Sequence, residues 1–131
     1  MTTASVSLTW PLAAWPNSNA DRRKHWTRQR REARAIRQAA RIEAARLRDV
    51  IAPAVVQLHG PVAVTLRFAF PDARHRDLDN YSAKALIDGL VDSGILADDD
   101  HRHIASVTRT LDPIKTLRGH LRVTVEIEEL A

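Results

Sequence analysis

The sequence predicts an α+β fold in which two helices pack on a small mixed β-sheet, in the order β-α-β-α-β-β. Two kinds of periodicity support this class. In three segments apolar residues alternate with polar ones, the period of a strand with one buried face. In two segments apolar residues recur every third or fourth position, the period of an amphipathic helix. At 131 residues the chain has room for one domain with one core, which we place over residues 1–131.

The first predicted strand lies near the N-terminus. Val6, Leu8 and Trp10 alternate there with serine and threonine, and Pro11 ends the pattern. From Pro11 to Lys24 the chain holds prolines and asparagines without a steady period, which predicts a loop.

The first helix is predicted from about Thr27, a candidate N-cap, to Ile51, with Pro53 as its stop. At 1.5 Å per residue such a helix is roughly 37 Å long, enough to follow several phosphates of a duplex. A solvated surface face explains its charges equally well, so both interpretations stay open. The helix carries an apolar stripe of Ala33, Ile36, Ala40, Ala44, Leu47 and Ile51, and a stripe of arginines at Arg30, Arg34, Arg37 and Arg41.

The remaining elements follow in order. Perfect alternation predicts a strand from Val62 to Phe70, which Pro71 ends. The second helix is closed by Gly94, a natural residue for a left-handed helix end. Two strands follow, 104–111 and 121–127, and we expect them to pair as an antiparallel hairpin. The core stripe of the second helix is Ala83, Leu86, Ile87, Leu90 and Val91.

Charge is unevenly distributed along the chain, whose formal net charge is +4. Residues 22–48 hold eleven lysines and arginines against two acids, a balance suited to phosphates. Residues 72–100 hold eight of the sixteen acids, a density suited to a metal ion. Because there is no cysteine, disulfides, thiolate zinc sites and cysteine nucleophiles are excluded.

The sequence carries no pattern of a membrane or secreted protein. Its apolar runs are short and interrupted, so we expect no membrane span. The first ten residues lack a basic region followed by a continuous apolar region, so no secretory signal is predicted. We expect a cytoplasmic protein.

The candidate metal ligands stand on both sides of the second helix. Asp77 and Asp79 are two residues apart, so in an extended segment both point the same way and converge on one cation. The alternative is N-capping of a helix at Tyr81, which accounts for one of the two acids. The triplet Asp98-Asp99-Asp100 follows the helix, which can return it to a neighbouring sheet edge. Such all-oxygen ligands favour Mg²⁺, with Mn²⁺ as the other candidate.

Three further residues near these acids have two interpretations each. Lys84 forms either a surface pair with Asp88, four residues on, or a positive group beside the metal. His101 and His103 form a short H-x-H pattern that could supply imidazoles to zinc or manganese. We favour exposed polar residues at a strand start for this pair.

Specific motifs join these acids in one segment, Pro71 to Ile104: R-D-L-D-N, then K-A-L-x-D-x-L, then a glycine followed closely by an aspartate pair. This segment resembles the RusA family of Holliday junction resolvases. The resemblance extends more weakly to Thr9-Trp-Pro11 and Pro16-Asn-Ser-Asn19. It implies a RusA-like fold and a homodimeric, Mg²⁺-dependent endonuclease. Such an enzyme makes paired symmetric nicks in four-way DNA junctions, in recombination and repair, and is typically encoded by phages or prophages.

The resemblance also implies roles for individual residues. Asp77 and Asp79 match the two metal-binding aspartates, and Lys84 matches the essential lysine of the K-A-L motif. The third catalytic aspartate is Asp99 when counted forward from the glycine and Asp100 when counted back from the next strand.

The spacing departs from the family at one point, because one extra residue separates Asn80 from Lys84. If the extra residue lengthens the turn, Lys84 keeps its helical phase and its role. If it falls within the helix, Lys84 rotates by about 100°. We expect it in the turn, because the apolar stripe stays in register after Lys84.

The leading hypothesis is phosphodiester hydrolysis in branched DNA; the alternatives are a broader branched-DNA or flap nuclease and a non-catalytic DNA-binding module. Trp10, Trp15 and Trp26 could stack on bases, although we expect at least two of them to pack in a core or interface. The residues we expect to contact DNA are Arg30, Arg34, Arg37, Arg41, Arg76 and Asn80.

Overall fold

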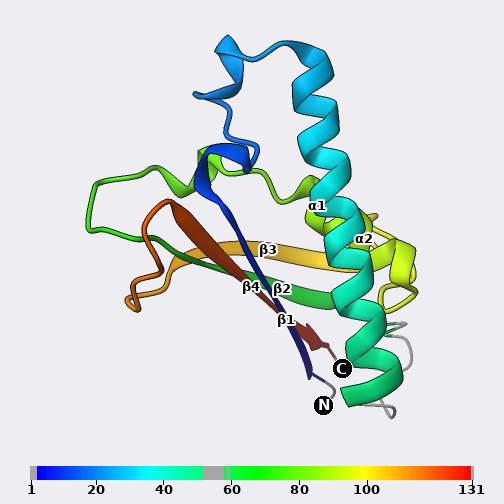
Figure 1. Ribbon diagram of the computed structural model, residues 1–131. Coiled ribbons are helices and arrows are strands. Elements are labelled where there is room, and N and C mark those ends of the chain that lie inside the picture. The colour runs from blue at the N-terminus through cyan, green and yellow to red at the C-terminus, as the bar shows by residue number, and fades with distance from the viewer. Residues whose placement is uncertain (1–2, 52–57, 59, 131) are drawn as a thin grey trace.

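A computed structural model of the chain describes residues 3–51, 58 and 60–130, with the side chains of Val50 and Ile51 outside the description. It confirms the α+β class and the predicted order of elements (Figure 1). The strands are β1 (Thr3–Pro11), β2 (Val62–Ala69), β3 (Ile104–Leu111) and β4 (His120–Glu129), and the helices are α1 (Trp26–Arg46) and α2 (Lys84–Ser93).

The four strands form one mixed sheet in the order β1-β4-β2-β3. β4 pairs antiparallel with β1 and with β2, whereas β2 and β3 are parallel, joined through α2. The expected hairpin between the last two strands is therefore wrong. The strand order follows from burial. The inward residues of β4 are fully buried and need a strand on each side, whereas β3 is mostly exposed and suits an edge of the sheet.

Both helices lie on the same side of the sheet (Figure 1). The residues on the other face are mostly polar. Alternate residues of β1, β2 and β4 point to the helices and are buried, as the predicted alternation requires. On the opposite face Ser7 and Thr124 share a hydrogen bond of 2.9 Å, and Arg67 pairs with Glu126. The largest fully buried side chains include Trp15, Ile36, Leu66, Phe68, Leu86, Leu90 and Leu121.

The two helices approach closely at small residues. A Cβ added to Gly89 would lie 2.6 Å from the Ala40 Cβ and 2.5 Å from the Arg37 carbonyl oxygen, so α1 and α2 nearly touch there. Beside this contact Arg37 donates to the Asp92 carboxylate at 2.6 and 2.9 Å. This pairing raises the pKa of Arg37 and lowers that of Asp92. Arg37 therefore fastens one helix to the other.

The bounds of the helices differ slightly from the predicted ones. The N-cap of α1 is His25, whose Nδ1 accepts from the Thr27 amide at 3.1 Å, and not Thr27 itself. After Arg46 the chain continues as a π-helical turn, Leu47–Ile51; the predicted stop at Pro53 and the Ile51 side chain lie outside the described residues. α2 ends at Ser93 and is capped by Gly94, whose φ of 86° is the left-handed conformation expected there. No described helix is long and apolar enough to cross a membrane.

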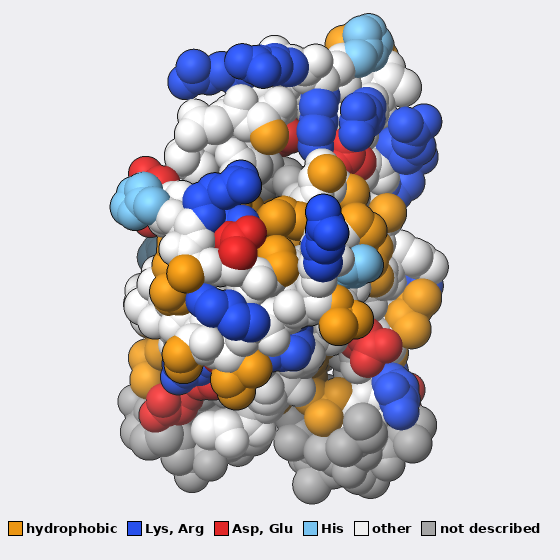
Figure 2. All heavy atoms as spheres, turned by 60° about the vertical axis from the view of Figure 1, so that its left-hand side comes forward, with side chains coloured by type: hydrophobic (Ala, Val, Ile, Leu, Met, Phe, Trp, Pro, Cys, Tyr) orange, Lys and Arg blue, Asp and Glu red, His pale blue; other side chains and the backbone are white. Residues whose placement is uncertain are grey.

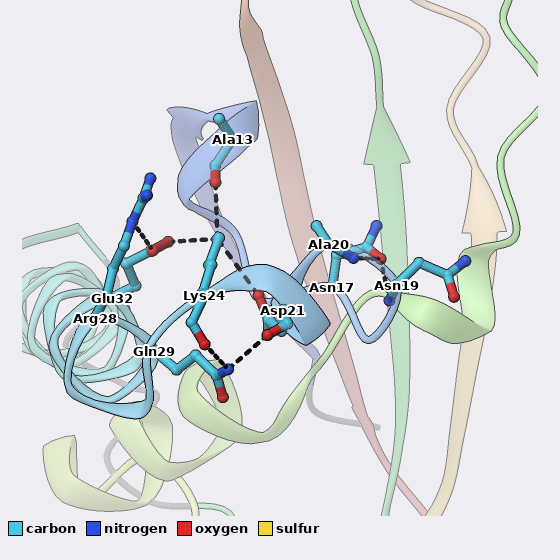
Figure 3. Close-up of polar contacts among 9 residues, drawn as sticks. All are labelled: Ala13, Asn17, Asn19, Ala20, Asp21, Lys24, Arg28, Gln29 and Glu32. Atoms are coloured by element: carbon cyan, nitrogen blue, oxygen red, sulfur yellow. Dashed lines mark hydrogen bonds and ion pairs between the residues drawn. The ribbon is translucent and has the colours of Figure 1, made fainter.

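The segment before α1 is fixed by one lysine (Figure 3). The side chain of Lys24 is only 9% exposed, and its Nζ lies 3.0 Å from the Ala13 carbonyl oxygen, 2.9 Å from Glu32 and 3.4 Å from Asp21. Gln29 adds hydrogen bonds to the carbonyl oxygens of Asp21 and Lys24. The segment predicted as a loop, residues 11–24, is therefore ordered, and its contacts hold the N-terminal end of α1 in place.

Candidate functional site

The R-D-L-D-N motif forms a capped turn. Asp77 is extended, but Leu78–Asn80 is a 3₁₀ turn, and the Asp77 carboxylate accepts from the Asp79 amide at 3.1 Å. The expectation of an extended segment with two parallel carboxylates is therefore wrong, because capping bends the chain. Asp77 is therefore a capping residue, as the alternative interpretation held. It caps the 3₁₀ turn Leu78–Asn80, however, and not a helix that starts at Tyr81. Leu78 packs against the core.

Hydrogen bonds join this turn to the segment that precedes α1. The Ser18 amide donates to the Asn80 carbonyl oxygen at 2.9 Å, and the Ser18 hydroxyl donates to the Asn80 side-chain oxygen at 3.0 Å. The indole of Trp15 donates to the Ser82 carbonyl oxygen at 2.9 Å. Asn80, predicted to contact DNA, thus also has a structural role through its amide oxygen.

Arg76, another predicted DNA contact, is largely buried. Its guanidinium carbon lies 4.4 Å from the centre of the Phe70 ring, and Nη1 donates to Asp72 at 2.8 Å. The side chain is 8% exposed. This hydrogen bond lowers the pKa of Asp72. Arg76 therefore organises the loop between β2 and the turn.

Lys84 is the first residue of α2 and is well exposed. Tyr81, Ser82 and Ala83, which separate Asn80 from Lys84, all lie before the helix. The Nζ of Lys84 lies 3.4 Å from Asp88 and 3.8 Å from Asp99. The surface pair and the approach to the acidic triplet are thus both present, since the chain after α2 returns to the first residue of the helix.

The three members of the acidic triplet have different surroundings. Asp100 accepts from His103 at 2.7 Å and pairs with Arg102 at 2.9 Å, and these contacts, with His103 the larger, lower the pKa of Asp100. Asp98 accepts from the Asp99 amide at 2.7 Å. The carboxylate of Asp99 is directed to Lys84. Asp99 is therefore the member that faces the start of α2.

The predicted ligands do not all gather within ligand distance. Among the described residues, the group of three whose ligand atoms lie within 4.8 Å of one another is Asp98, Asp100 and His103. Two of these already share a hydrogen bond, and the guanidinium of Arg102 neutralises Asp100. His103, in the turn directly before β3, is half-buried, while His101 is exposed.

Two hollows meet at Lys84 and Asp88. One, of about 400 Å³, lies between α1 and the start of α2 and is also lined by Arg30, Arg34 and Arg37. The other, of about 340 Å³, lies between α2 and β3 and is also lined by Asp99, His101, Ile104 and Val107. Asp77 lines a separate hollow with Asn80. A positively charged groove and an acid-lined groove thus share one wall.

The predicted arginine stripe divides between structural and open positions. Arg37 is bound to α2, whereas Arg30, Arg34 and Arg41 are exposed. Figure 2 shows lysine and arginine side chains gathered over the upper part of the molecule, the end at which α1 begins in Figure 1. Arg109, which was not among the predicted site residues, donates from its Nε to the Tyr81 carbonyl oxygen at 3.2 Å. The sequence signal for this residue was its position: Arg109 is a basic residue between Val107 and Leu111, where alternate positions of the strand are otherwise apolar.

An α+β chain that sets a lysine between an arginine-lined and an acid-lined hollow has the charge pattern of an enzyme acting on phosphodiesters. The family model of endodeoxyribonuclease RusA matches residues 11–128, and the chain belongs to this family. It is therefore a nuclease of the endodeoxyribonuclease class. A comparison with curated proteins gave no match.

Proposed function

We propose that the protein is a Mg²⁺-dependent endonuclease that resolves four-way DNA junctions by paired symmetric nicks. The observation that carries this is the contact of Lys84 with Asp99 at 3.8 Å, on the wall between the two hollows. It joins the K-A-L motif to the acidic triplet, two parts of the family pattern that are separated by the whole of α2.

The acids fit a hard divalent cation. Asp77, Asp79 and Asp99 are exposed and offer only carboxylate oxygens, which suit Mg²⁺ or Mn²⁺. These three residues would hold the ion after drawing together, because their ligand atoms do not all lie within 4.8 Å of one another in the structure. A bound ion would lower the pKa of a water molecule and offset charge at phosphorus. Lys84 places a positive charge beside Asp99, where it would stabilise the negative charge that develops on the phosphate.

The arginine-lined hollow is suited to the DNA backbone next to the cleaved phosphate. Arg30 and Arg34 line it together with Lys84, so a strand held by these arginines passes the lysine. Arg37 contributes less, because its guanidinium is already paired with Asp92. Arg41 is one turn further along the same helix and extends this contact line.

The surroundings of the triplet favour Asp99 as the third metal ligand. We expect Asp99→Asn to lower the rate of junction cleavage at least a hundredfold with an unchanged melting temperature, because its carboxylate faces Lys84 and caps no turn. We expect Asp100→Asn to lower the melting temperature, since Asp100 holds His103 and Arg102. Cleavage kinetics and thermal melts of both variants test this. The reverse pattern would assign the role to Asp100.

The proposed homodimer has a candidate surface at the edge strand β3. This strand pairs only with β2 among the described strands, so its other edge is free for a further strand. Val107 and Leu111 are exposed on its helix side, and Ile114 and Leu117 are exposed just beyond it. Since Val107 also lines the hollow of Asp99, a second copy seated here would border that site.

The double variant Val107→Lys with Leu111→Lys is expected to be a monomer of 14.7 kDa by light scattering, where the unmodified chain has twice that mass. Its nicks in a junction should then be unpaired. Ser5→Lys, an exposed position on the opposite edge strand, is the control and should leave the mass unchanged. An unmodified chain that is monomeric at assay concentration contradicts the proposal.

The proposed activity is tested with a synthetic four-way junction, a flap and a linear duplex of shared sequence, each incubated with Mg²⁺ or with EDTA. Paired nicks in the junction alone, only with metal, are expected. Comparable cleavage of the flap would instead identify a broader branched-DNA nuclease. Salt-sensitive binding without cleavage in Mg²⁺ or Mn²⁺ would identify a non-catalytic DNA-binding module.

A further inference from the structure

Trp26 is presented to solvent at the start of α1. Its side chain is 60% exposed, whereas Trp15 is 1% exposed and Trp10 is partly buried. Of the tryptophans considered as base-stacking residues, Trp26 is thus the one with an open ring. A large aromatic surface left in water carries a cost in free energy and is typical of a binding site.

The side chains of Arg30 and His25 lie against this ring. The guanidinium carbon of Arg30, one turn further along α1, lies 5.4 Å from the ring centre, and the His25 ring lies 5.3 Å away, tilted by 33°. The short helix η2 (Asp21–Arg23) and the first turns of α1 add exposed arginines. The nearby acids Asp21 and Glu32 are both bound to Lys24. The exposed arginines here are Arg22, Arg23, Arg28, Arg30 and Arg31.

The ring is carried by a well-connected support. The buried Lys24 joins Ala13, Asp21 and Glu32 directly before the helix (Figure 3). His25 then caps the helix whose first residue is Trp26. Because these contacts fix the backbone, little order is lost when a flat ligand stacks on the ring.

A ligand for this surface needs a flat apolar face and negative charge beside it. A nucleotide has both, since its base stacks on tryptophan and its phosphates pair with arginine. Arg30 joins this surface to the proposed cleavage site, because it touches Trp26 and also lines the hollow of Lys84. A DNA strand bound by Arg30 would therefore lie next to Trp26 and next to the hollow of Lys84.

We propose that Trp26 is a stacking platform for a base exposed at the branch point of the DNA substrate. This rests on the proposed function, since a branch point exposes base faces that a continuous duplex keeps stacked. Trp26 would thus contribute to the choice of branched over linear DNA, at a position distinct from the acids and Lys84.

The test uses 2-aminopurine, a fluorescent base, placed at the branch point of a four-way junction or within one arm, with binding measured in EDTA so that nothing is cleaved. The unmodified chain should change the emission of the branch-point probe and leave the arm probe unchanged. Trp26→Ala should abolish this change and weaken junction binding about tenfold or more, with linear-duplex affinity altered less than twofold. Trp26→Phe, which keeps a ring, should retain most of both effects.

Ile42→Ala, at another exposed apolar position of α1, is the matched control and should behave as the unmodified chain. An unchanged probe signal and junction affinity in Trp26→Ala would overturn the inference. So would a change in self-association by light scattering without a change in DNA binding, which would assign Trp26 to a protein contact. Because no step depends on cleavage, failure of the proposed activity and failure of the stacking role give different results.

Discussion

Asp79→Asn is expected to abolish cleavage of a four-way junction, with a loss of at least a hundredfold in rate. The substitution removes one ligand charge from the proposed metal site and leaves a carboxamide, a weaker ligand for Mg²⁺. Binding of the junction should stay the same or become tighter, since a negative charge next to the DNA is lost. Gel-based cleavage in Mg²⁺ and junction titration in EDTA measure the two quantities.

Asp79 suits this test better than its neighbour Asp77. The Asp77 side chain caps the 3₁₀ turn, whereas the Asp79 carboxylate has no hydrogen bond or ion pair to another described residue. The melting temperature of Asp79→Asn should therefore be unchanged. Glu128→Gln, an exposed acid on β4, serves as the control and should cleave normally. Loss of folding together with binding in Asp79→Asn would assign the acids a structural role.

Gly89→Ala is expected to destabilise the protein, although alanine is the better helix former. The new Cβ would meet the Arg37 carbonyl oxygen at 2.5 Å and the Ala40 Cβ at 2.6 Å, so α1 and α2 must separate. Overpacking of this kind costs about 1–3 kcal/mol, more than the ~1 kcal/mol gained in helix propensity. We expect a fall of roughly 5 °C in the melting temperature.

The effect should extend to DNA binding, because the arginine-lined hollow lies between these two helices. Gly60→Ala is the matched control: among the described residues, its added Cβ would meet the Leu130 carbonyl oxygen at 3.7 Å and the Glu129 side chain at 3.8 Å, both ordinary contact distances. This variant should melt no lower than the unmodified chain, because alanine at an unstrained position restricts the unfolded chain. A Gly89→Ala variant as stable as the control would show that the helices can separate without cost.

The sequence by itself determined the elements of the fold. Period-2 alternation located β2 and β4, and the apolar stripe with Gly94 located α2, because burial on one face fixes such patterns locally. It also determined the family, since the motifs near Asp77 and Lys84 keep close to their spacing along the chain. Local pattern, however, does not specify which strands become neighbours.

Only the tertiary structure decided the pairing and the surroundings of the charges. β4 lies between β1 and β2 because its inward face is apolar throughout, a choice that depends on the competition among all strands. The close contact of α1 and α2 at Gly89 joins residues that are far apart in sequence, so no local sequence pattern predicts it.

The same holds for the arginine stripe and for the triplet. Arg34 and Arg37 belong to the same arginine stripe of α1, but Arg37 is paired with Asp92 whereas Arg34 lines the hollow. The difference arises because Asp92 of α2 lies opposite Arg37. Asp99 faces Lys84 while Asp100 is bound to His103, although the two acids are adjacent in sequence. Residue type and spacing determine which groups are present, and long-range packing determines which of them remain free to act.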